Sequence, residues 1–551
     1  MSQAFLFTSW DSAQDFGRFL PFVPHDSSVQ EFGCARLRRW TVRGSADASH
    51  SLVMDGWIED KTALSGAITA SAAHAVIRNS GGEFAVVNVA PDGHALAFCD
   101  FLGGRHIYYR QTGAKLAISN RALLVAAAFG APEIEPAEMA WFMASIACPF
   151  TEKTAWRDVK ILDAGAVMSW DGDLKLRPTP IEPADHPWEH LWESLCARVR
   201  GLAVSHATNR LAITGGLDSR LVFAAAIGSR SLGQFTHAYL RGHEDMADVK
   251  VARQIADHYN IPFELSSPEL LTEPVETIID RHNFQTECGL HCWDLKGLTT
   301  APNVQSFHGN FGEIFRSHSL PRFVLGWPEV ERKYLSENYL DLYDVMTPDA
   351  VQHVRAGIRT WLDEKKREGV PPLKLHDRMH RAARMHRWVG QTSQVDGFLG
   401  GSVNPIPSPK MLSRYLHLSL MNQKIHRTHF EMIRRADDWL WRQPFANDGW
   451  SRLIAPRWVQ RPAPVRNGPM AKSRQMALWE REAGALADLV LGDDSSEFDQ
   501  LFDRVRVERL VKSTQKNPTP HRVRAILGLA GIRRSLVAPS RRHVCTIEEA
   551  Q

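Results

Sequence analysis

The chain has 551 residues, 44% of them hydrophobic, and a formal net charge of only +3 from 65 basic and 62 acidic side chains. This composition predicts two or three conventionally packed domains, and the near balance of charge argues against a nucleic-acid partner. No stretch approaches the ~20 apolar residues of a membrane span, and the start of the chain lacks the features of a secretion signal. We therefore expect a cytoplasmic protein with no membrane partner.

The seven cysteines are scattered and odd in number, which favours a reducing compartment. Cys288 and Cys292 lie near His282 and His291, a combination that suggests a zinc site. The spacing is not that of a paired Cys-x-x-Cys ligand set, so we predict buried thiols there and no zinc.

The first part of the chain, residues 1–120, contains short apolar runs separated by turns. This spacing predicts a β-rich domain of the sandwich type. A helix is expected at 134–147, and the Pro-rich run 178–183 is typical of a linker, so we place the N-terminal domain at 1–180. The runs expected to be strands include 84–89, 95–99 and 115–119.

A helix with an apolar face is expected from Trp188 to Val199, and the segment after it carries the strongest functional signal. An apolar strand ends at Gly215 and Gly216, which allow a sharp turn and a close approach to a ligand, and a helix begins directly afterwards. The amides at the start of a helix attract anions, and Asp218 would suit a Mg²⁺ that accompanies a polyphosphate. The predicted nucleotide-binding residues of this loop are Ile213, Thr214, Gly215, Gly216, Asp218 and Ser219; an ordinary strand-to-helix turn is the alternative.

Strand and helix patterns continue to alternate beyond this loop, with strands expected at 234–240 and 261–265 and a helix at 245–259. This β-α-β-α-β order predicts an α/β fold with a doubly wound parallel sheet, which binds its ligand at the carboxyl ends of the strands. We place this second domain at 185–460 and a helical C-terminal extension at 461–551. The Arg-rich part of the extension, 504–542, is predicted to be solvated helix, with a peptide or partner contact as the alternative.

The loop resembles the SGGxDS pyrophosphate loop of the ATP-pyrophosphatases, and in particular that of the asparagine synthetase family, with Thr214 in place of the first serine. The resemblance implies that His237 lies beside the adenine, although a packed strand histidine is also compatible with the pattern. Residues 304–316 resemble the family's second signature, G-E/D-G-x-D-E-L-F, which implies that His308 and Gly309 contact the nucleotide. Asn310 stands where an acid is usual, so Glu313 would join Asp218 on Mg²⁺, or would cap a helix instead.

Later segments also follow the family's order, at 404–412, 416–420 and 424–430, and residues 438–449 resemble a loop that carries a lysine in the family. That lysine, which balances charge as pyrophosphate leaves, is missing. Arg442, Lys424 or Lys472 could replace it, and the sequence does not distinguish among them.

The N-terminal part is similar to class II glutamine amidotransferase domains at 82–85, 100–109 and 117–120. The amidotransferase mechanism needs an N-terminal thiol after removal of the initiator Met, and Ser2 occupies that position. The family's Asn-Gly-Glu stretch is also absent. The resemblance therefore implies an N-terminal domain without glutaminase activity, as in β-lactam synthetases and lasso-peptide cyclases, rather than a glutaminase that uses Ser2.

The resemblance as a whole implies an ATP- and Mg²⁺-dependent ligase that adenylates a carboxylate, releases pyrophosphate and passes the acyl group to an amine. Asp218, Glu313, Lys424 and Arg442 are the predicted catalytic residues. The amine would belong to the substrate, as in the macrolactam closure of a lasso-peptide precursor, with a peptide or small-molecule carboxylate as substrate and a leader-peptide protease as a partner. The alternatives are an ammonia- or amine-dependent synthetase, including the β-lactam-forming type, and a nucleotide-binding protein without turnover.

Overall fold

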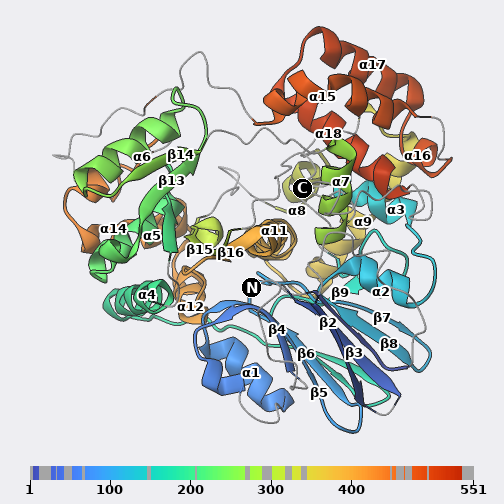
Figure 1. The fold of residues 1–551 in the computed structure, drawn as a ribbon, viewed down its shortest axis with the longest axis horizontal. Coiled ribbons are helices and arrows are strands. Elements are labelled where there is room, and N and C mark those ends of the chain that lie inside the picture. Colours follow the sequence, from blue (N-terminus) through green and yellow to red (C-terminus); the bar gives the residue numbers. More distant parts are fainter. Residues whose placement is uncertain are drawn as a thin grey trace.

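A computed structural model gives the fold (Figure 1). It combines two antiparallel sheets in the first third of the chain, one parallel sheet in the middle and a helical region at the C-terminal end. The structure describes residues 4–10, 26–32, 34–41, 52–64, 69–144, 151–204, 208–266, 274–287, 301–316, 326–336, 344–446, 449–454, 465, 474–492 and 496–536.

The two antiparallel sheets pack face to face as the predicted sandwich. Their strand orders are β2-β3-β1-β8-β7-β9 and β11-β10-β6-β5-β4. Side chains alternate between the two faces of a strand: Phe5 and Phe7 pack with Val87 of the other sheet, whereas Leu6 belongs to a second cluster on the outer face. The elements are β1 Ala4–Thr8, β2 Asp26–Phe32, β3 Ala35–Thr41, β4 Leu52–Ile58, η2 Lys61–Leu64, α1 Ala70–Asn79, β5 Gly82–Val89, β6 Ala95–Cys99, β7 Tyr108–Thr112, β8 Lys115–Ser119, α2 Ala122–Ala128, α3 Pro136–Ala144, β9 Lys160–Ile161, β10 Ala166–Trp170 and β11 Leu174–Pro178.

The third sheet is parallel, with the order β14-β13-β12-β15-β16, which confirms the doubly wound α/β prediction. After β14 the chain returns to the other side of β12, so the strand order reverses between β12 and β15. Open parallel sheets bind ligands at such a switch point. The elements are α4 Trp188–Ala203, β12 Thr208–Ala212, α5 Leu217–Gly228, η3 Leu232–Gln234, β13 His237–Arg241, α6 Ala247–His258, β14 Phe263–Ser266, α7 Val275–Gln285, β15 Ala301–Phe307, η5 Asn310–Phe315, α11 Gln391–Leu399 and β16 Gly400–Val403.

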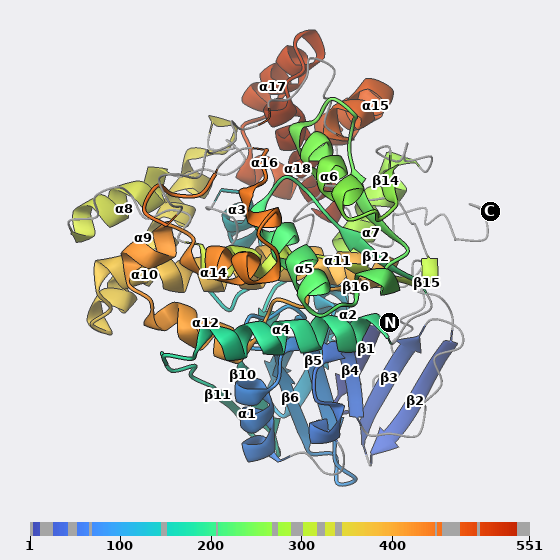
Figure 2. The ribbon, with the colours of Figure 1, turned by 90° about the vertical axis from the view of Figure 1, so that its left-hand side faces the viewer.

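Helices cover the parallel sheet closely. Helices α4 and α5 pack together at Gly228, where an added Cβ would lie 2.3 Å from the indole of Trp192. Figures 1 and 2 show α4, α5 and α14 on the side of the sheet turned away from α7 and α11. The predicted strand 234–240 begins only at His237, because residues 232–234 form a 3₁₀ turn.

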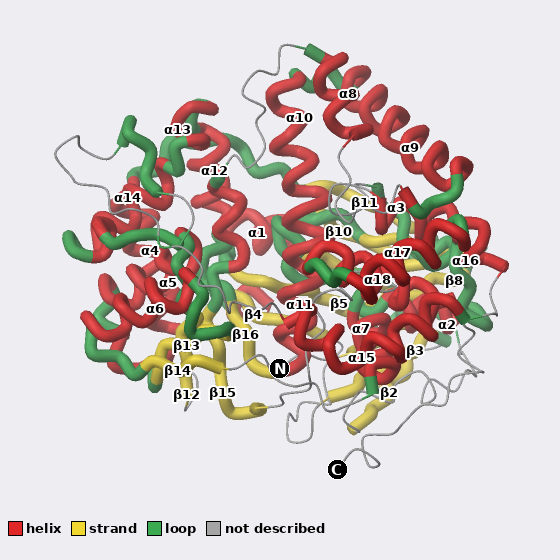
Figure 3. The backbone as a smooth tube through the Cα atoms, turned by 90° about the horizontal axis from the view of Figure 1, so that it is seen from above, coloured by secondary structure: helices red, strands yellow, loops and turns green. Residues whose placement is uncertain are grey.

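The helical extension packs against the rest of the molecule, and one prediction about it is wrong. Helix α18 is buried along most of its length and packs against α15 and α7, and the three helices lie together in Figure 3. Its Arg534 forms a bidentate ion pair with Asp280 at 2.8 Å, so residues 520–536 are core and not solvated helix. The remaining elements are α8 Trp327–Ser336, α9 Pro348–Arg367, α10 Pro372–Met379, the π-helix η7 His380–Gly390, α12 Pro409–His417, α13 Leu420–Lys424, α14 Arg427–Ala436, η8 Leu440–Arg442, α15 Arg474–Leu491, α16 Ser496–Leu501, α17 Arg504–Lys516 and α18 Pro520–Leu536.

Residues 179–187, between β11 and α4, contain neither helix nor strand, at the place where the Pro-rich run predicts a linker. The division into domains at 1–180, 185–460 and 461–551 stays a prediction. Across the described part of the chain, no helix combines the length and apolar character needed to cross a bilayer.

Candidate functional site

The loop after β12 is braced from within by its own hydroxyl groups. The Thr214 amide donates to Ser219 Oγ at 3.0 Å, the two hydroxyls lie 2.9 Å apart, and the Gly216 amide donates to Thr214 Oγ1 at 3.0 Å. Ile213 is buried and donates its amide to the Tyr239 carbonyl of β13. Gly216 is the N-cap of α5 and has no side chain to cap the helix, so the start of α5 offers amides to an anion.

Gly215 ties this loop to two other segments. Its amide donates to Asp248 Oδ1 of α6 at 2.9 Å, and its carbonyl accepts the Ala446 amide at 3.1 Å. An added Cβ at Gly215 would lie 2.5 Å from Ala446 Cβ, so only glycine permits this approach. Burial raises the pKa of Asp248, and the hydrogen bond from Gly215 opposes that shift.

The segment 443–446 is fastened to α5 by Arg220, which is fully buried. Its guanidinium donates to the carbonyls of Gln443 and Pro444 at 3.0 and 2.6 Å and lies 3.9 Å from the centre of the Phe445 ring. Burial lowers the pKa of Arg220 to about 9, which still leaves the group charged at neutral pH. The loop predicted from 438–449 is therefore held directly against the first loop.

The segment after β15 packs against the start of α5 from the other side. An added Cβ at Gly309 would lie 2.5 Å from the Asp218 carbonyl, and one at Gly312 would lie 2.5 Å from Asp218 Oδ1. His308 shares a 3.1 Å hydrogen bond with the Tyr239 hydroxyl, and its amide donates to Val403 of β16. The two predicted signatures therefore lie in contact at the switch point.

The predicted carboxylates are both paired with basic side chains. Asp218 accepts hydrogen bonds from Arg316 and, at 2.8 Å, from His429 Nε2 of α14. Burial lowers the pKa of His429, although the adjacent Asp218 raises it, so His429 acts at neutral pH as an uncharged donor. Glu313 accepts two bonds of 2.9 Å from Arg384 of the π-helix η7.

The other predicted site residues lie apart from this cluster. His237 begins β13 opposite Arg210, at the amino end of the strand, and its Nε2 lies 3.0 Å from Glu264. Lys424 is exposed at the end of α13, and Arg442 pairs with the exposed Asp438 at 2.5 Å. Ser2, Cys288, His291, Cys292 and Lys472 lie outside the described residues.

The donor set suits a cation that arrives with a nucleotide better than a free metal ion. Within the described ranges, no group of three or more His, Cys, Asp or Glu side chains is arranged to hold a metal. A nucleotide-bound Mg²⁺ needs only one or two protein carboxylates, because phosphates and waters supply the other ligands. Asp218 and Glu313 are the two carboxylates that would hold such an ion, once their partners Arg316 and Arg384 turn toward the phosphates.

Sequence reasoning missed the residues that contribute charge to the site. Arg316 is the last residue of the 304–316 segment, and this position was the signal available for it. Arg384 lies in a helical segment without a recognisable motif, and Arg220 sits within the apolar face of α5. His429 lies within the 424–430 segment that resembles the family, but that resemblance gave this histidine no role. Their roles depend on contacts between segments 71 to 224 residues apart.

Comparisons with known proteins add little to this description. No family model and no curated protein match the chain. A solved structure of glutamine phosphoribosylpyrophosphate amidotransferase from B. subtilis, complexed with ADP and GMP, superposes with a TM-score of 0.20 and 9% identity, over 48% of this chain and 65% of that one. A structure described as the allosteric regulatory enzyme of purine biosynthesis gives 0.18 and 9%, over 48% and 64%.

The chain thus covers less than two thirds of either of those structures. TM-scores this low carry no argument about fold or function. The fold class follows from the strand order and layers of the molecule itself, as a mixed α/β protein with antiparallel sheets, a parallel sheet and a helical C-terminal region.

Proposed function

We propose that the protein is an ATP-dependent ligase that adenylates a carboxylate, releases pyrophosphate and transfers the acyl group to an amine. The observation that carries this proposal is the convergence of three separate segments, 213–219, 308–316 and 443–446, at the switch point of the parallel sheet. These are segments whose sequences resemble the nucleotide loops of the asparagine synthetase family. The alternative, that 213–219 is an ordinary strand-to-helix turn, does not explain why the segments 308–316 and 443–446 pack against it.

In this proposal the amides at the start of α5 bind the β- and γ-phosphates, and the hydroxyls of Thr214 and Ser219 keep the loop in shape. Mg²⁺ would be held by Asp218 and Glu313 and would neutralise charge on the leaving pyrophosphate. Arg316 and Arg384 lie beside these carboxylates and supply further positive charge. Arg316 is therefore a better substitute for the family's loop lysine than the exposed Arg442.

The proposed reaction has two steps. A carboxylate oxygen of the substrate attacks the α-phosphorus of ATP, and the bond to the bridging oxygen of pyrophosphate breaks. An amine then attacks the acyl carbon, AMP departs with its oxygen, and the amine loses a proton to solvent. Guanidinium groups directed at the developing charge favour the first step, because electrostatic stabilisation acts where charge accumulates.

A second candidate function is nucleotide binding without turnover. The specific observation in its favour is that both predicted metal ligands, Asp218 and Glu313, are already neutralised by arginines. A protein that only binds nucleotide has no need to release these carboxylates for Mg²⁺.

The test is pyrophosphate exchange into ATP with Mg²⁺, over a panel of acidic peptides and small carboxylic acids. The proposal expects exchange with at least one acid, and AMP rather than ADP as product. Asp218→Asn should lower the rate by ~10³-fold or more, since it removes a charge that acts at the leaving group. Asp438→Asn makes the same change at an exposed aspartate that is also paired with an arginine, and serves as control. ATP binding without exchange for any acid would favour the second candidate.

A further inference from the structure

We infer that Glu83, in the N-terminal sandwich, is a positioning residue for the nucleotide site and acts through Asn404. This inference rests on the proposed function, because it assigns a role in the reaction. The connection consists of two side chains, both fully buried, that lead from strand β5 to the first residue of η5.

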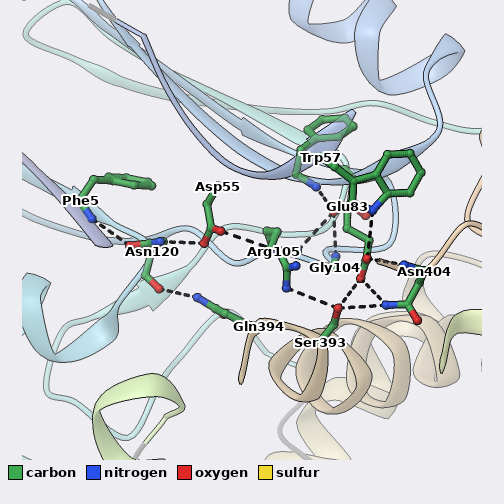
Figure 4. A network of polar contacts seen from close by, with 12 residues as sticks. Phe5, Asp55, Trp57, Glu83, Gly104, Arg105, Asn120, Ser393, Gln394 and Asn404 are labelled. Atoms are coloured by element: carbon green, nitrogen blue, oxygen red, sulfur yellow. Dashed lines mark hydrogen bonds and ion pairs between the residues drawn. The ribbon is translucent and has the colours of Figure 1, made fainter. Parts of the chain in front are cut away.

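Glu83 lies where the sandwich meets the parallel-sheet part of the chain (Figure 4). Its Oε1 accepts the Ser393 hydroxyl and, at 2.9 Å, the Asn404 side-chain amide. Its Oε2 accepts the Asn404 backbone amide at 3.0 Å and Trp57 Nε1 at 3.3 Å. Three of these four donors therefore come from α11 and from the residue directly after β16, more than 300 positions along the chain.

The carboxylate fixes the orientation of the Asn404 side chain. A carboxylate only accepts hydrogen bonds, so the Nδ2 of Asn404 must face Glu83, and its Oδ1 must face the opposite way. On that side Oδ1 accepts the backbone amide of Asn310 at 3.1 Å. Asn310 opens η5, the segment that places Gly312 against Asp218 and also contains Glu313.

A second contact joins the same two parts of the molecule. Phe311 is fully buried, and an added Cβ at Gly104 of the sandwich would lie 3.2 Å from its ring. The same Cβ would lie 3.0 Å from Glu83 Cβ. The first turn of η5 is therefore connected to the sandwich in two ways. Hydrogen bonds link Asn310 to Glu83 through Asn404, and Phe311 packs against Gly104.

A purely structural role does not account well for Glu83. An ionised group without solvent contact is costly to bury, and well-packed apolar residues often serve stability as well or better. Among the described residues, no arginine or lysine forms an ion pair with this carboxylate, and Arg105 is connected to it through Ser393, to which it donates at 3.4 Å. What the carboxylate achieves is a single orientation of Asn404 and, through it, a fixed position for η5.

The experiment compares Asn404→Leu, Glu83→Gln and the double variant Glu83→Gln with Asn404→Asp. Asn404→Leu removes the side-chain contact, and Glu83→Gln leaves one accepting oxygen where two now accept from the side-chain and backbone amides of Asn404. The double change restores it with the polarity reversed, because the new amide at position 83 donates to the new carboxylate at 404, which still accepts from Asn310. Gln394→Leu is the matched control: Gln394 is also fully buried on α11 and donates across the same interface, to the Asn120 carbonyl, without a bond to η5.

Two measurements are needed, hydrogen exchange of peptides that cover 309–316 and the kcat and KM for ATP in pyrophosphate exchange. Both single variants should raise amide exchange at 310–313 and lower kcat by about 10- to 100-fold with little change in KM, because a displacement of about 1 Å costs this much in rate. The double variant should restore most of the amide protection at 310–313 and most of kcat. The inference would be overturned if the single variants showed the same amide exchange and kcat as Gln394→Leu. It would also be overturned if the double variant had faster amide exchange or a lower kcat than either single variant.

Failure of the proposed function gives a different result. If the parent protein shows no exchange with any acid, the function is refuted. The hydrogen-exchange comparison then still decides whether Glu83 holds η5 in place.

Discussion

A single methyl group tests the contact between the two loops that we propose bind nucleotide, 213–219 and 308–316. Gly309 has φ −103°, which any residue adopts, so Gly309→Ala adds no backbone strain. The new Cβ would lie 2.5 Å from the carbonyl carbon and oxygen of Asp218 and 2.7 Å from the Ser219 amide nitrogen. Ordinary contacts begin at 3.4 Å, so the second loop must move away from α5 by about 0.9 Å.

Overpacking of this kind costs about 1–3 kcal/mol of unfolding free energy, and a displacement of about 1 Å at a reacting centre costs about 100-fold in rate. The assays are urea unfolding and pyrophosphate exchange. Gly201→Ala is the control, because Gly201 is a solvent-exposed residue of helix α4 and nothing lies within 4 Å of its new Cβ. There we expect the unfolding free energy to rise by ~0.5–1 kcal/mol. Stability and exchange unchanged in Gly309→Ala would refute the described packing of the loops.

Three further predictions concern pH, charge and product. Burial lowers the pKa of His106 from 6.5 to about 3, so the unfolded chain binds a proton that the folded one rejects, and stability falls as pH drops below 6.5. Between pH 6 and 4, His106→Gln should reduce the slope of the unfolding free energy against pH by up to ~1.4 kcal/mol per pH unit, as measured by urea unfolding. An unchanged slope would contradict this role of His106. Arg316→Met should slow pyrophosphate exchange by ~100-fold or more while Arg442→Met changes it by less than about threefold; the reverse order would return the role to Arg442. If the amine is internal to a peptide substrate, acetylating that amine should abolish loss of water, measured by mass spectrometry, while adenylation persists, and equal dehydration of both peptides would exclude an internal amine.

The sequence predicted those parts of the fold that depend on local patterns. The short apolar runs at 84–89 and 95–99 and the glycine pair after β12 are visible in the sequence, and the strands and the loop occur where these patterns are. The meeting of 213–219 with 308–316 was implied by the family resemblance, and it agrees with the rule that open parallel sheets bind ligands at a switch point. These features need only local patterns or a recognised order of motifs.

The missed features depend on partners far away in the chain. Helix α18 was predicted to be solvated because of its arginines, yet the uninterrupted apolar run 525–532 indicates a helix buried on all sides. Its Arg533 is buried and donates to the carbonyl of Val490, and such hydrogen bonding of a buried arginine cannot be read from its sequence neighbours. The same holds for Arg316 and His429, which become site residues only because Asp218 faces them.

The burial of α18 against α7 also bears on how the chain folds during synthesis. Helix α7 contributes Val275, Ile278 and Ile279 to the core, but the helix that covers it lies more than 230 residues later. Domains generally fold as they emerge from the ribosome, and contacts this distant in sequence form late. We therefore expect α7 to stay uncovered until translation is almost complete, so that a chain truncated after residue 460 would expose this apolar face and be prone to aggregate.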